Sequence, residues 1–234
     1  MSRVALFKVA PVAPEGRGAF IVSCLLAAVL AGLLGAEALW WLLPALAAVG
    51  WYHRDPQRTV PALPLAIVAP VDGVVGAAGA AFDPWLGRAA QAVTLRAGAL
   101  DVHAIYSPIE GKIVEQWSTP RHGDGALDGA GHALAFLVRT DEGDDVVLEI
   151  ARELRAARLH LAYQPGERVG HGRRIGYAPL GCRIRVYCAA ESIVGITPGA
   201  RASGAETVLM QLLHEAPVSA IPATEEAADG AGAT

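Results

Sequence analysis

Two short stretches, Ile67 to Val75 (IVAPVDGVV) and Tyr106 to Val114 (YSPIEGKIV), share one pattern: proline, an apolar residue, an acidic residue, glycine, any residue and an apolar residue. Proline and glycine between β-prone residues predict a strand, a tight turn and a second strand in each stretch. A second pair, PGERVGHGRRIG at 165–176 and PGARASGAETVL at 198–209, also resemble each other. The sequence therefore predicts a mainly β (α+β) domain, a barrel or sandwich of pseudo-repeated β-hairpins. One further segment, 146–161, fits a helix, although its VVLEI run could equally be a strand.

A long apolar segment precedes this domain. Between Ala19 and Tyr52 the only charged residue is Glu37, which divides the segment into AFIVSCLLAAVLAGLLG and ALWWLLPALAAVGWY. Each half is slightly shorter than the ~20 residues that cross a bilayer as a helix, so we expect a helical membrane hairpin with Glu37 at its far tip. A cleaved signal peptide is the alternative, and the apolar segment is too long for one.

The flanks of the apolar segment predict its orientation. Basic residues lie on both sides of it, so the positive-inside rule places both flanks in the cytoplasm, and aromatic residues lie where they would anchor the helix ends at the membrane surface. The basic residues are Arg3, Lys8, Arg17, Arg54 and Arg58, and the aromatic ones are Trp40, Trp41, Trp51 and Tyr52. We thus expect a leader at 1–18, a membrane hairpin anchor at 19–52, a β domain at 53–216 and a disordered tail at 217–234.

The composition of the chain argues against nucleic acid, a disulfide and a zinc ion as binding partners or structural features. The net charge of −4 and the pI near 6.0 give no basic excess for binding nucleic acid. If Cys182 and Cys188 lie in one strand, they are roughly 20 Å apart, too far for a disulfide. No cysteine or histidine spacing typical of a zinc site occurs, so we expect no metal.

Five patches of the chain, taken in order, resemble one known family. They are YHRDPQR at 52–58, APVDGVV at 69–75, DVHAIYSPIEGKIV at 101–114, VVLEIARELRAARLHL at 146–161 and GERVGHGRRIGYAPLGCRIRVY at 166–187. The chain resembles the short-form, bacterial and archaeal phosphatidylserine decarboxylases over nearly all of residues 50–213. These enzymes cleave their own chain and convert a serine at the cut into a pyruvoyl group. Here Cys182 follows Gly181 at that position.

The resemblance implies a mechanism. The chain would break between Gly181 and Cys182, residue 182 would become the covalent pyruvoyl cofactor, and the enzyme would be a heterodimer of its own two fragments. The substrate would be phosphatidylserine or a related serine-headed lipid at the cell (inner) membrane, and phosphatidylethanolamine the product. His103 is nominated as the base, oriented by Asp72, with Asp101 as a weaker candidate. Without the resemblance, Asp72 is equally a turn residue and His103 a core histidine.

Some residues depart from the family pattern. The family's Asn-Arg pair is replaced by Ile105 and Tyr106, and Arg185 stands where an acidic residue is common. The residues that bind substrate stay unassigned. The arginines that could meet a lipid phosphate are Arg54, Arg58, Arg152, Arg155, Arg158 and Arg183.

Two other interpretations stay open from the sequence. The first keeps the family fold and makes the protein a non-catalytic pseudoenzyme, because cysteine replaces serine at position 182. The second is a biotinyl- or lipoyl-like adaptor module at the membrane, which uses similar glycine-rich hairpins. That module needs a lysine at a hairpin tip, and Lys112, the only lysine besides Lys8, lacks the flanking methionines.

Overall fold

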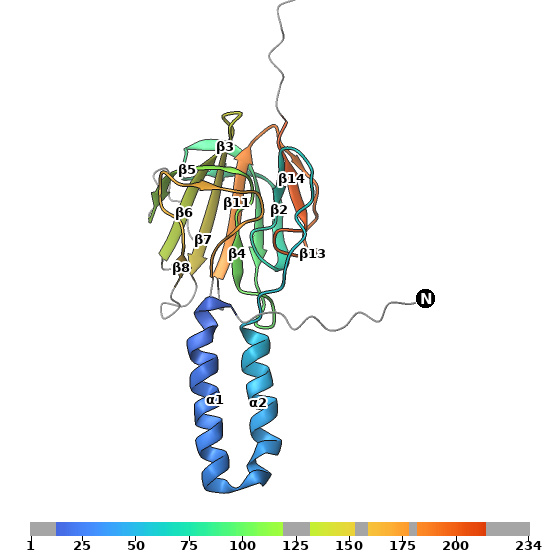
Figure 1. Cartoon of the computed structure of the whole chain (residues 1–234). Coiled ribbons are helices and arrows are strands. Elements are labelled where there is room, and N and C mark those ends of the chain that lie inside the picture. The colour runs from blue at the N-terminus through green and yellow to red at the C-terminus, as the bar shows by residue number, and fades with distance from the viewer. Residues whose placement is uncertain (1–12, 119–131, 153–158, 178–181, 214–234) are drawn as a thin grey trace, which may run out of the picture.

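The computed structural model describes residues 13–118, 132–152, 159–177 and 182–213 of the chain, and it shows a helical hairpin projecting from a β domain (Figure 1). The helices are α1 (Pro14–Leu34), the short 3₁₀ helix η1 (Ala36–Ala38) and α2 (Leu39–Tyr52). The strands are β1 (Ala66–Val68), β2 (Gly73–Asp83), β3 (Arg88–Arg96), β4 (Ala104–Tyr106), β5 (Gly111–Trp117), β6 (His132–Arg139), β7 (Asp145–Arg152), β8 (His160–Leu161), β9 (Arg168–Val169), β10 (Arg174–Tyr177), β11 (Cys182–Ala189), β12 (Ile193–Val194), β13 (Arg201–Ala202) and β14 (Val208–Gln211).

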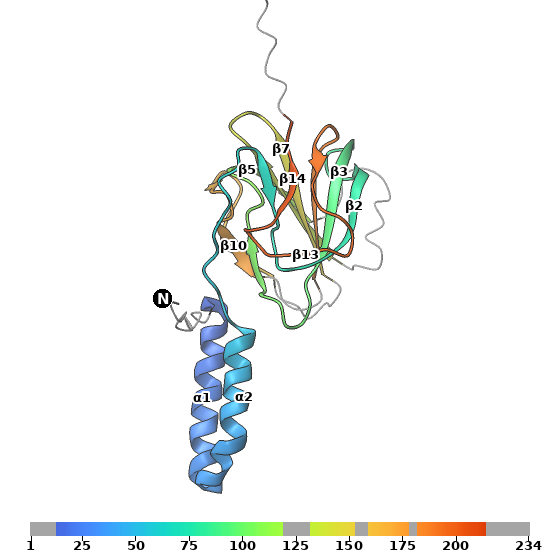
Figure 2. The ribbon, with the colours of Figure 1, turned by 90° about the vertical axis from the view of Figure 1, so that its right-hand side faces the viewer.

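The predicted hairpin is confirmed as two antiparallel helices that lie side by side in both views (Figures 1 and 2). Helix α1 begins at a proline, ends before Gly35 at a positive φ of 89°, and is about 31 Å long at 1.5 Å per residue. It is long and apolar enough to cross a bilayer, and only 6% of its most apolar window is buried. Helix α2 is apolar but shorter, and Glu37 lies in η1 at the far tip, as expected.

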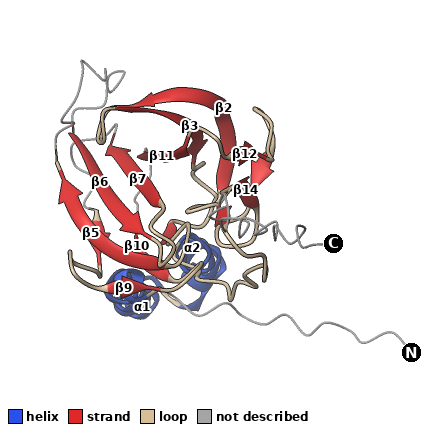
Figure 3. Ribbon diagram, turned by 90° about the horizontal axis from the view of Figure 1, so that it is seen from above, coloured by secondary structure: helices blue, strands red, loops and turns tan. Residues whose placement is uncertain are grey.

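The β domain consists of one large sheet and two small ones. The large sheet has the order β13-β2-β3-β11-β7-β6-β5-β9, and its described strands begin with β13 and end with β9 without a closing pair. The small sheets have the orders β1-β14-β12 and β4-β10-β8. Viewed from above, the large sheet curves around the small ones (Figure 3). The main core contains side chains from all three sheets, including Ile67, Ile105, Leu148, Ile184 and Met210.

The strand-turn-strand prediction is confirmed for both repeated stretches, with one difference. In each stretch the two strands do not pair with each other: β1 pairs with β14 and β4 with β10, while β2 and β5 belong to the large sheet. Each turn is therefore a corner at which the chain passes from a small sheet into the large one. At both corners a glycine is required, because a Cβ on Gly73 would lie 2.4 Å from the carbonyl oxygen of Arg96, and one on Gly111 would lie 2.3 Å from that of Arg139.

The internal repeat extends to the second pair of stretches. The amide of Val68 donates to the carbonyl of Pro108 and the amide of Tyr106 donates to that of Pro70, both at 2.8 Å, so the two corners hold each other reciprocally. Strands β13 and β9 flank β2 and β5 in the same way. Gly172 and Ala205, which match in the two stretches, both have a positive φ, of 63° and 62°. The two halves of the domain are thus related by an approximate two-fold repeat.

The possible helix at 146–161 is wrong over its first half. Residues 145–152 form β7, which pairs with β6 on one side and β11 on the other. All residues from Val146 to Ala151 are buried. Pairing on both edges and packing on both faces therefore favour a strand over a helix for this segment. Residues 153–158, the predicted leader up to residue 12 and the predicted tail from residue 217 lie outside the described residues.

Candidate active site

His103 lies just before β4, at the end of the β domain that faces the helices. Its side chain is 2% exposed, and neither ring nitrogen makes a hydrogen bond within the part of the chain that the structure describes. A buried imidazole normally satisfies both nitrogens, and leaving them unpaired costs about 1–3 kcal/mol per group. A histidine that serves only the core would not be left in this state, so the geometry favours a functional His103.

Aromatic rings surround His103. The ring of Tyr52, the last residue of α2, lies 4.7 Å from the His103 ring between centroids, and the ring of Tyr177 lies 5.9 Å away. His53 in turn contacts both tyrosines, with centroids at 5.0 and 6.4 Å. Tyr177 is paired with Ala104 across β10 and β4, which sets its ring beside His103. The sequence analysis placed Tyr52 among the membrane-surface aromatics and in the family-like stretch 52–58 but not in the site, and it did not single out Tyr177.

Burial sets the charge of His103. It lowers the pKa of the imidazole below its ordinary value, and the positive charge of Arg54 acts in the same direction. Asp101 opposes these effects, and Asp72 opposes them more weakly. The imidazole is therefore neutral at pH 7, with one nitrogen free to accept a proton.

Asp72 is not hydrogen-bonded to His103. Its carboxylate accepts a hydrogen bond from Arg58 at 2.6 Å and one from the backbone amide of Gly204 at 2.7 Å. Arg58 also pairs with Glu206 at 3.4 Å. The relay in which Asp72 orients the imidazole directly is thus not formed, and the visible role of Asp72 is to tie the segment after α2 to the loop before β14.

This geometry predicts the effect of Asp72→Asn. Because the ion pair with Arg58 is only 13–16% exposed, the substitution is expected to lower the free energy of unfolding by about 1–3 kcal/mol, with a small effect on catalysis by folded protein. Denaturant unfolding measures the first effect, and Asp145→Asn, which breaks a more exposed pair with Arg139, is the control. If the Asp72→Asn enzyme has normal stability but is as inactive as a His103 variant, the result would support a relay in which Asp72 orients His103.

Asp101, the weaker candidate, has other hydrogen-bond partners than His103. It accepts hydrogen bonds from the backbone amide of Gly98, at 2.8 Å, and from the guanidinium of Arg201. Its carboxylate is only 8% exposed. Of the two candidate carboxylates, Asp101 has the larger electrostatic effect on His103.

Cys182 is the first residue of β11, and its side chain is 3% exposed within the main core. Gly181 lies outside the described residues, so the structure locates only the Cys182 side of the expected scissile bond. Tyr177 ends β10 five residues before Cys182 begins β11. The start of β11 lies at the helix end of the domain in Figure 1, and β10 lies toward that end in Figure 2. The structure thus brings His103 close to the chain that leads into the expected cut. Cys182 and Cys188 lie on one strand, and no disulfide joins any of the described cysteines.

The departures from the family pattern fall mostly in the interior. Ile105 and Tyr106 are 0% and 4% exposed and pack in β4, so they are core residues. Arg185 lies on the other face of β11 from Cys182, where it donates to Thr94 and to the hydroxyl of Tyr187, both at 3.0 Å. That hydroxyl donates to the buried Glu149, also at 3.0 Å.

The arginines differ in their availability. Arg58 is occupied by its carboxylates, and Arg183 is buried. Arg54 lies at the end of α2, over the ring of Trp51 at 4.4 Å, and donates to the carbonyl of Leu100 at 2.7 Å. The side chains of Arg152, Arg155 and Arg158 lie outside the described part of the chain.

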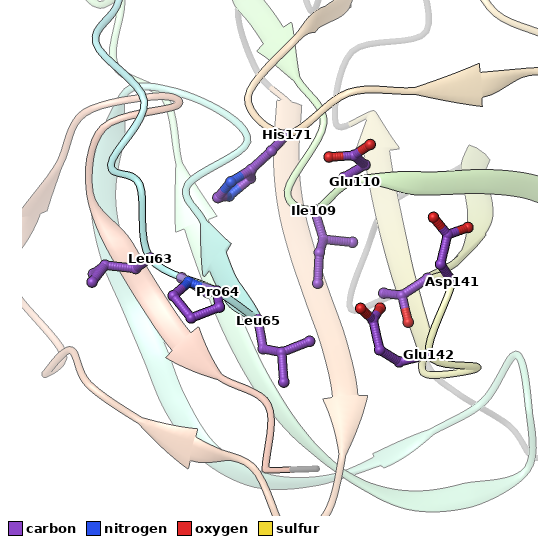
Figure 4. Close-up of a pocket in the computed structure, with 10 residues that line it drawn as sticks. Leu63, Pro64, Leu65, Ile109, Glu110, Asp141, Glu142 and His171 are labelled. Carbon is purple, nitrogen blue, oxygen red and sulfur yellow. The ribbon is translucent and has the colours of Figure 1, made fainter.

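A cavity of about 310 Å³ lies elsewhere in the domain (Figure 4). It is lined by Leu63, Pro64, Leu65, Ala66, Ile109, Glu110, Thr140, Asp141, Glu142 and His171. Residues 140–142 follow β6 and precede β7, at the opposite end of β7 from the residue that pairs with Cys182. The length of β7, roughly 23 Å at 3.3 Å per residue, separates this cavity from the candidate site.

The fold and site define a class: a β domain carried on a helical hairpin, with a buried neutral histidine where the two meet. The family model for phosphatidylserine decarboxylase matches residues 46–210. The chain is 34% identical over 200 residues to a phosphatidylserine decarboxylase proenzyme of Nitrosomonas europaea, covering 83% of this chain and 90% of that protein. It is 33% identical over 202 residues to the same proenzyme of Nitrosomonas eutropha, with the same coverage, and 30% identical over 185 residues to that of Aromatoleum aromaticum, covering 76% and 86%. No solved structure matches the chain.

The chain therefore belongs to the phosphatidylserine decarboxylase family, lyases of phospholipid biosynthesis that are made as proenzymes. The resemblance found in the sequence motifs is confirmed. Membership over 46–210, which includes nearly all of the described β domain, favours a decarboxylase over the adaptor module.

Proposed function

We propose that this chain decarboxylates phosphatidylserine, or a related serine-headed lipid, after cleaving itself between Gly181 and Cys182. The observation that carries the proposal is the state of His103, which is buried and neutral and has no hydrogen-bond partner among the described residues at either nitrogen, beside the strand that leads into the expected cut. Family membership supplies the reaction. The experiment is direct: purified protein in detergent is incubated with phosphatidylserine, and the ethanolamine lipid formed is measured.

Self-cleavage can be written with Cys182 as the nucleophile. The Cys182 sulfur attacks the Gly181 carbonyl carbon, the peptide C–N bond breaks, and the freed amine takes up a proton, leaving a thioester. A base then removes the Cα proton of residue 182, and the Cβ–S bond breaks. The Gly181 thiocarboxylate leaves, and residue 182 becomes dehydroalanine. Water converts its enamine to a ketone with release of ammonia, so the second fragment begins with a pyruvoyl group.

His103 is proposed as the base. Because burial lowers the pKa of its imidazole, the ring is neutral at pH 7 and can accept the proton of the Cys182 thiol. The pyruvoyl group supplies an electron sink for the departure of carbon dioxide from the bound serine head group. The buried start of β11 suits such a group, because the main core around Cys182 excludes water.

The hairpin is proposed to lie in the inner membrane with the β domain on the cytoplasmic side. The contact between Tyr52 and His103 then places the site where the helices leave the membrane, at the depth of lipid head groups. A serine head group could reach it without its acyl chains leaving the bilayer.

Topology provides a test of this arrangement. A reporter inserted at Glu37 and one fused to the carboxyl terminus are expected to fall on opposite sides of the membrane. The expectation rests on the apolar span of α1 and on the basic residues at both flanks of the hairpin. Reporters on the same side would show that the hairpin enters one leaflet without crossing.

A further inference from the structure

The helical hairpin is fixed to the β domain through β10. Arg174 of β10 pairs with Glu15 of α1 and, at 3.3 Å, with Asp55 after α2. At the base of the hairpin, the amide of Ala13 donates to the carbonyl of His53 at 2.7 Å. The start of α1, the segment after α2 and strand β10 are therefore joined by ion pairs and a backbone hydrogen bond in one junction.

Close packing strengthens this junction. A Cβ on Gly16 would lie 2.3 Å from the ring of His53, so only glycine lets α1 approach the end of α2 this closely. The hairpin is thus held in a defined position at the base of the β domain. A hairpin that served only as a flexible tether would not need this fixed position. Both ends of the hairpin contribute to that position.

Tyr52 connects this junction to the candidate site. Its ring packs on His103 with an interplanar angle of 40°, and its hydroxyl is hydrogen-bonded to Tyr177, the last residue of β10. Tyr52 therefore touches the proposed base with its ring and holds the strand before the expected cut with its hydroxyl.

We propose that Tyr52, a residue of the membrane anchor, is a positioning residue of the decarboxylase site that fixes the His103 ring and the end of β10. The inference rests on the proposed function of His103. Its consequence is that the anchor completes the site, in addition to holding the protein at the membrane. Only a properly seated hairpin gives a working enzyme.

The inference is tested with Tyr52→Ala and Tyr52→Phe, with Leu43→Ala as a control because Leu43 lies on the same helix, exposed and away from the domain. Tyr52→Ala is expected to slow self-cleavage, and with it to lower kcat per total protein, about 10- to 100-fold with little change in KM, because the base is misplaced. Tyr52→Phe, which keeps the ring, is expected to lose less, and Leu43→Ala to match wild type. Equal activity of Tyr52→Ala and wild type would overturn the inference.

A second measurement does not depend on activity. In uncleavable Cys182→Ala protein, the titration of His103 is followed by histidine-labelled NMR with and without Tyr52→Ala. The charged groups that act on His103 are Asp101, Arg54, His53 and Asp72, and the rings against it are Tyr52 and Tyr177. Removing the Tyr52 ring admits water, so the pKa of His103 is expected to rise toward its ordinary value.

Activity and the His103 titration together distinguish a failure of the positioning role of Tyr52 from a failure of His103 as the base. An unchanged His103 titration in folded Tyr52→Ala protein contradicts the positioning role. A shifted titration together with full activity of a His103→Ala enzyme would show that the contact is as described while His103 is not the base. Tyr52→Phe guards against misfolding, because it keeps the packing of the ring.

Discussion

Cys182→Ala is expected to leave the chain uncleaved and to reduce decarboxylation to background, a loss of at least about 10⁴-fold. Alanine has no group that can attack the Gly181 carbonyl, and it cannot eliminate a leaving group from its Cβ. Because the side chain at 182 is buried and alanine is smaller, the fold is expected to survive at a cost of about 1–2 kcal/mol. Gel analysis and intact mass report the cleavage, and the lipid assay reports the activity.

Cys182→Ser completes this test, since serine is the residue that the family places there. The wild-type thiol is the better nucleophile, but its thioester is also open to hydrolysis, which would leave an ordinary cysteine at the new amino terminus. We expect wild type to mature slowly and incompletely, and Cys182→Ser to cleave faster and more completely. Activity in Cys182→Ala would contradict the assignment. An inert wild type with an active Cys182→Ser variant would make the protein a pseudoenzyme.

His103→Ala is expected to slow self-cleavage, and with it the formation of active decarboxylase, about 10²- to 10⁴-fold, the usual contribution of a general base. In wild type, burial lowers the pKa of His103, so the imidazole stays neutral to a lower pH than an ordinary histidine. The rate of self-cleavage is therefore expected to have its acid limb below pH 6.5, the ordinary histidine value, and to fall as the pH drops through that limb.

His171→Ala is the matched control for this prediction. His171 is also partly buried and also has a lowered pKa, but it lines the cavity at the other end of the domain. Its removal is expected to leave activity and cleavage unchanged. A His103→Ala enzyme as active as the His171→Ala enzyme would exclude His103 as the base.

The sequence predicted much of the architecture because local chemistry determines it. The paired Pro-x-acidic-Gly stretches predicted tight turns at Gly73 and Gly111, and both glycines face a backbone carbonyl that leaves no room for a Cβ. Glu37 divided the apolar segment at the point where η1 now joins the helices. These features depend on residues near each other in the chain, and the sequence shows them directly.

Long-range pairing limited the prediction of the site. The two corners were interpreted as hairpins, because the sequence does not show that β1 pairs with β14 and β4 with β10. The resemblance assigned Asp72 to orient His103, but the carboxylate of Asp72 instead accepts a hydrogen bond from Arg58. The packing of Tyr52 on His103 joins the anchor to the domain, and no local pattern predicts such a contact.

Mass spectrometry of the purified wild-type protein tests the central claim most directly. The account predicts a carboxyl-terminal fragment that runs from residue 182 to residue 234 and begins with a pyruvoyl group, together with some intact chain and with decarboxylation in proportion to the pyruvoyl-blocked fraction. Decarboxylation by a preparation that contains only intact chain, or a fragment that begins at another residue, would contradict it.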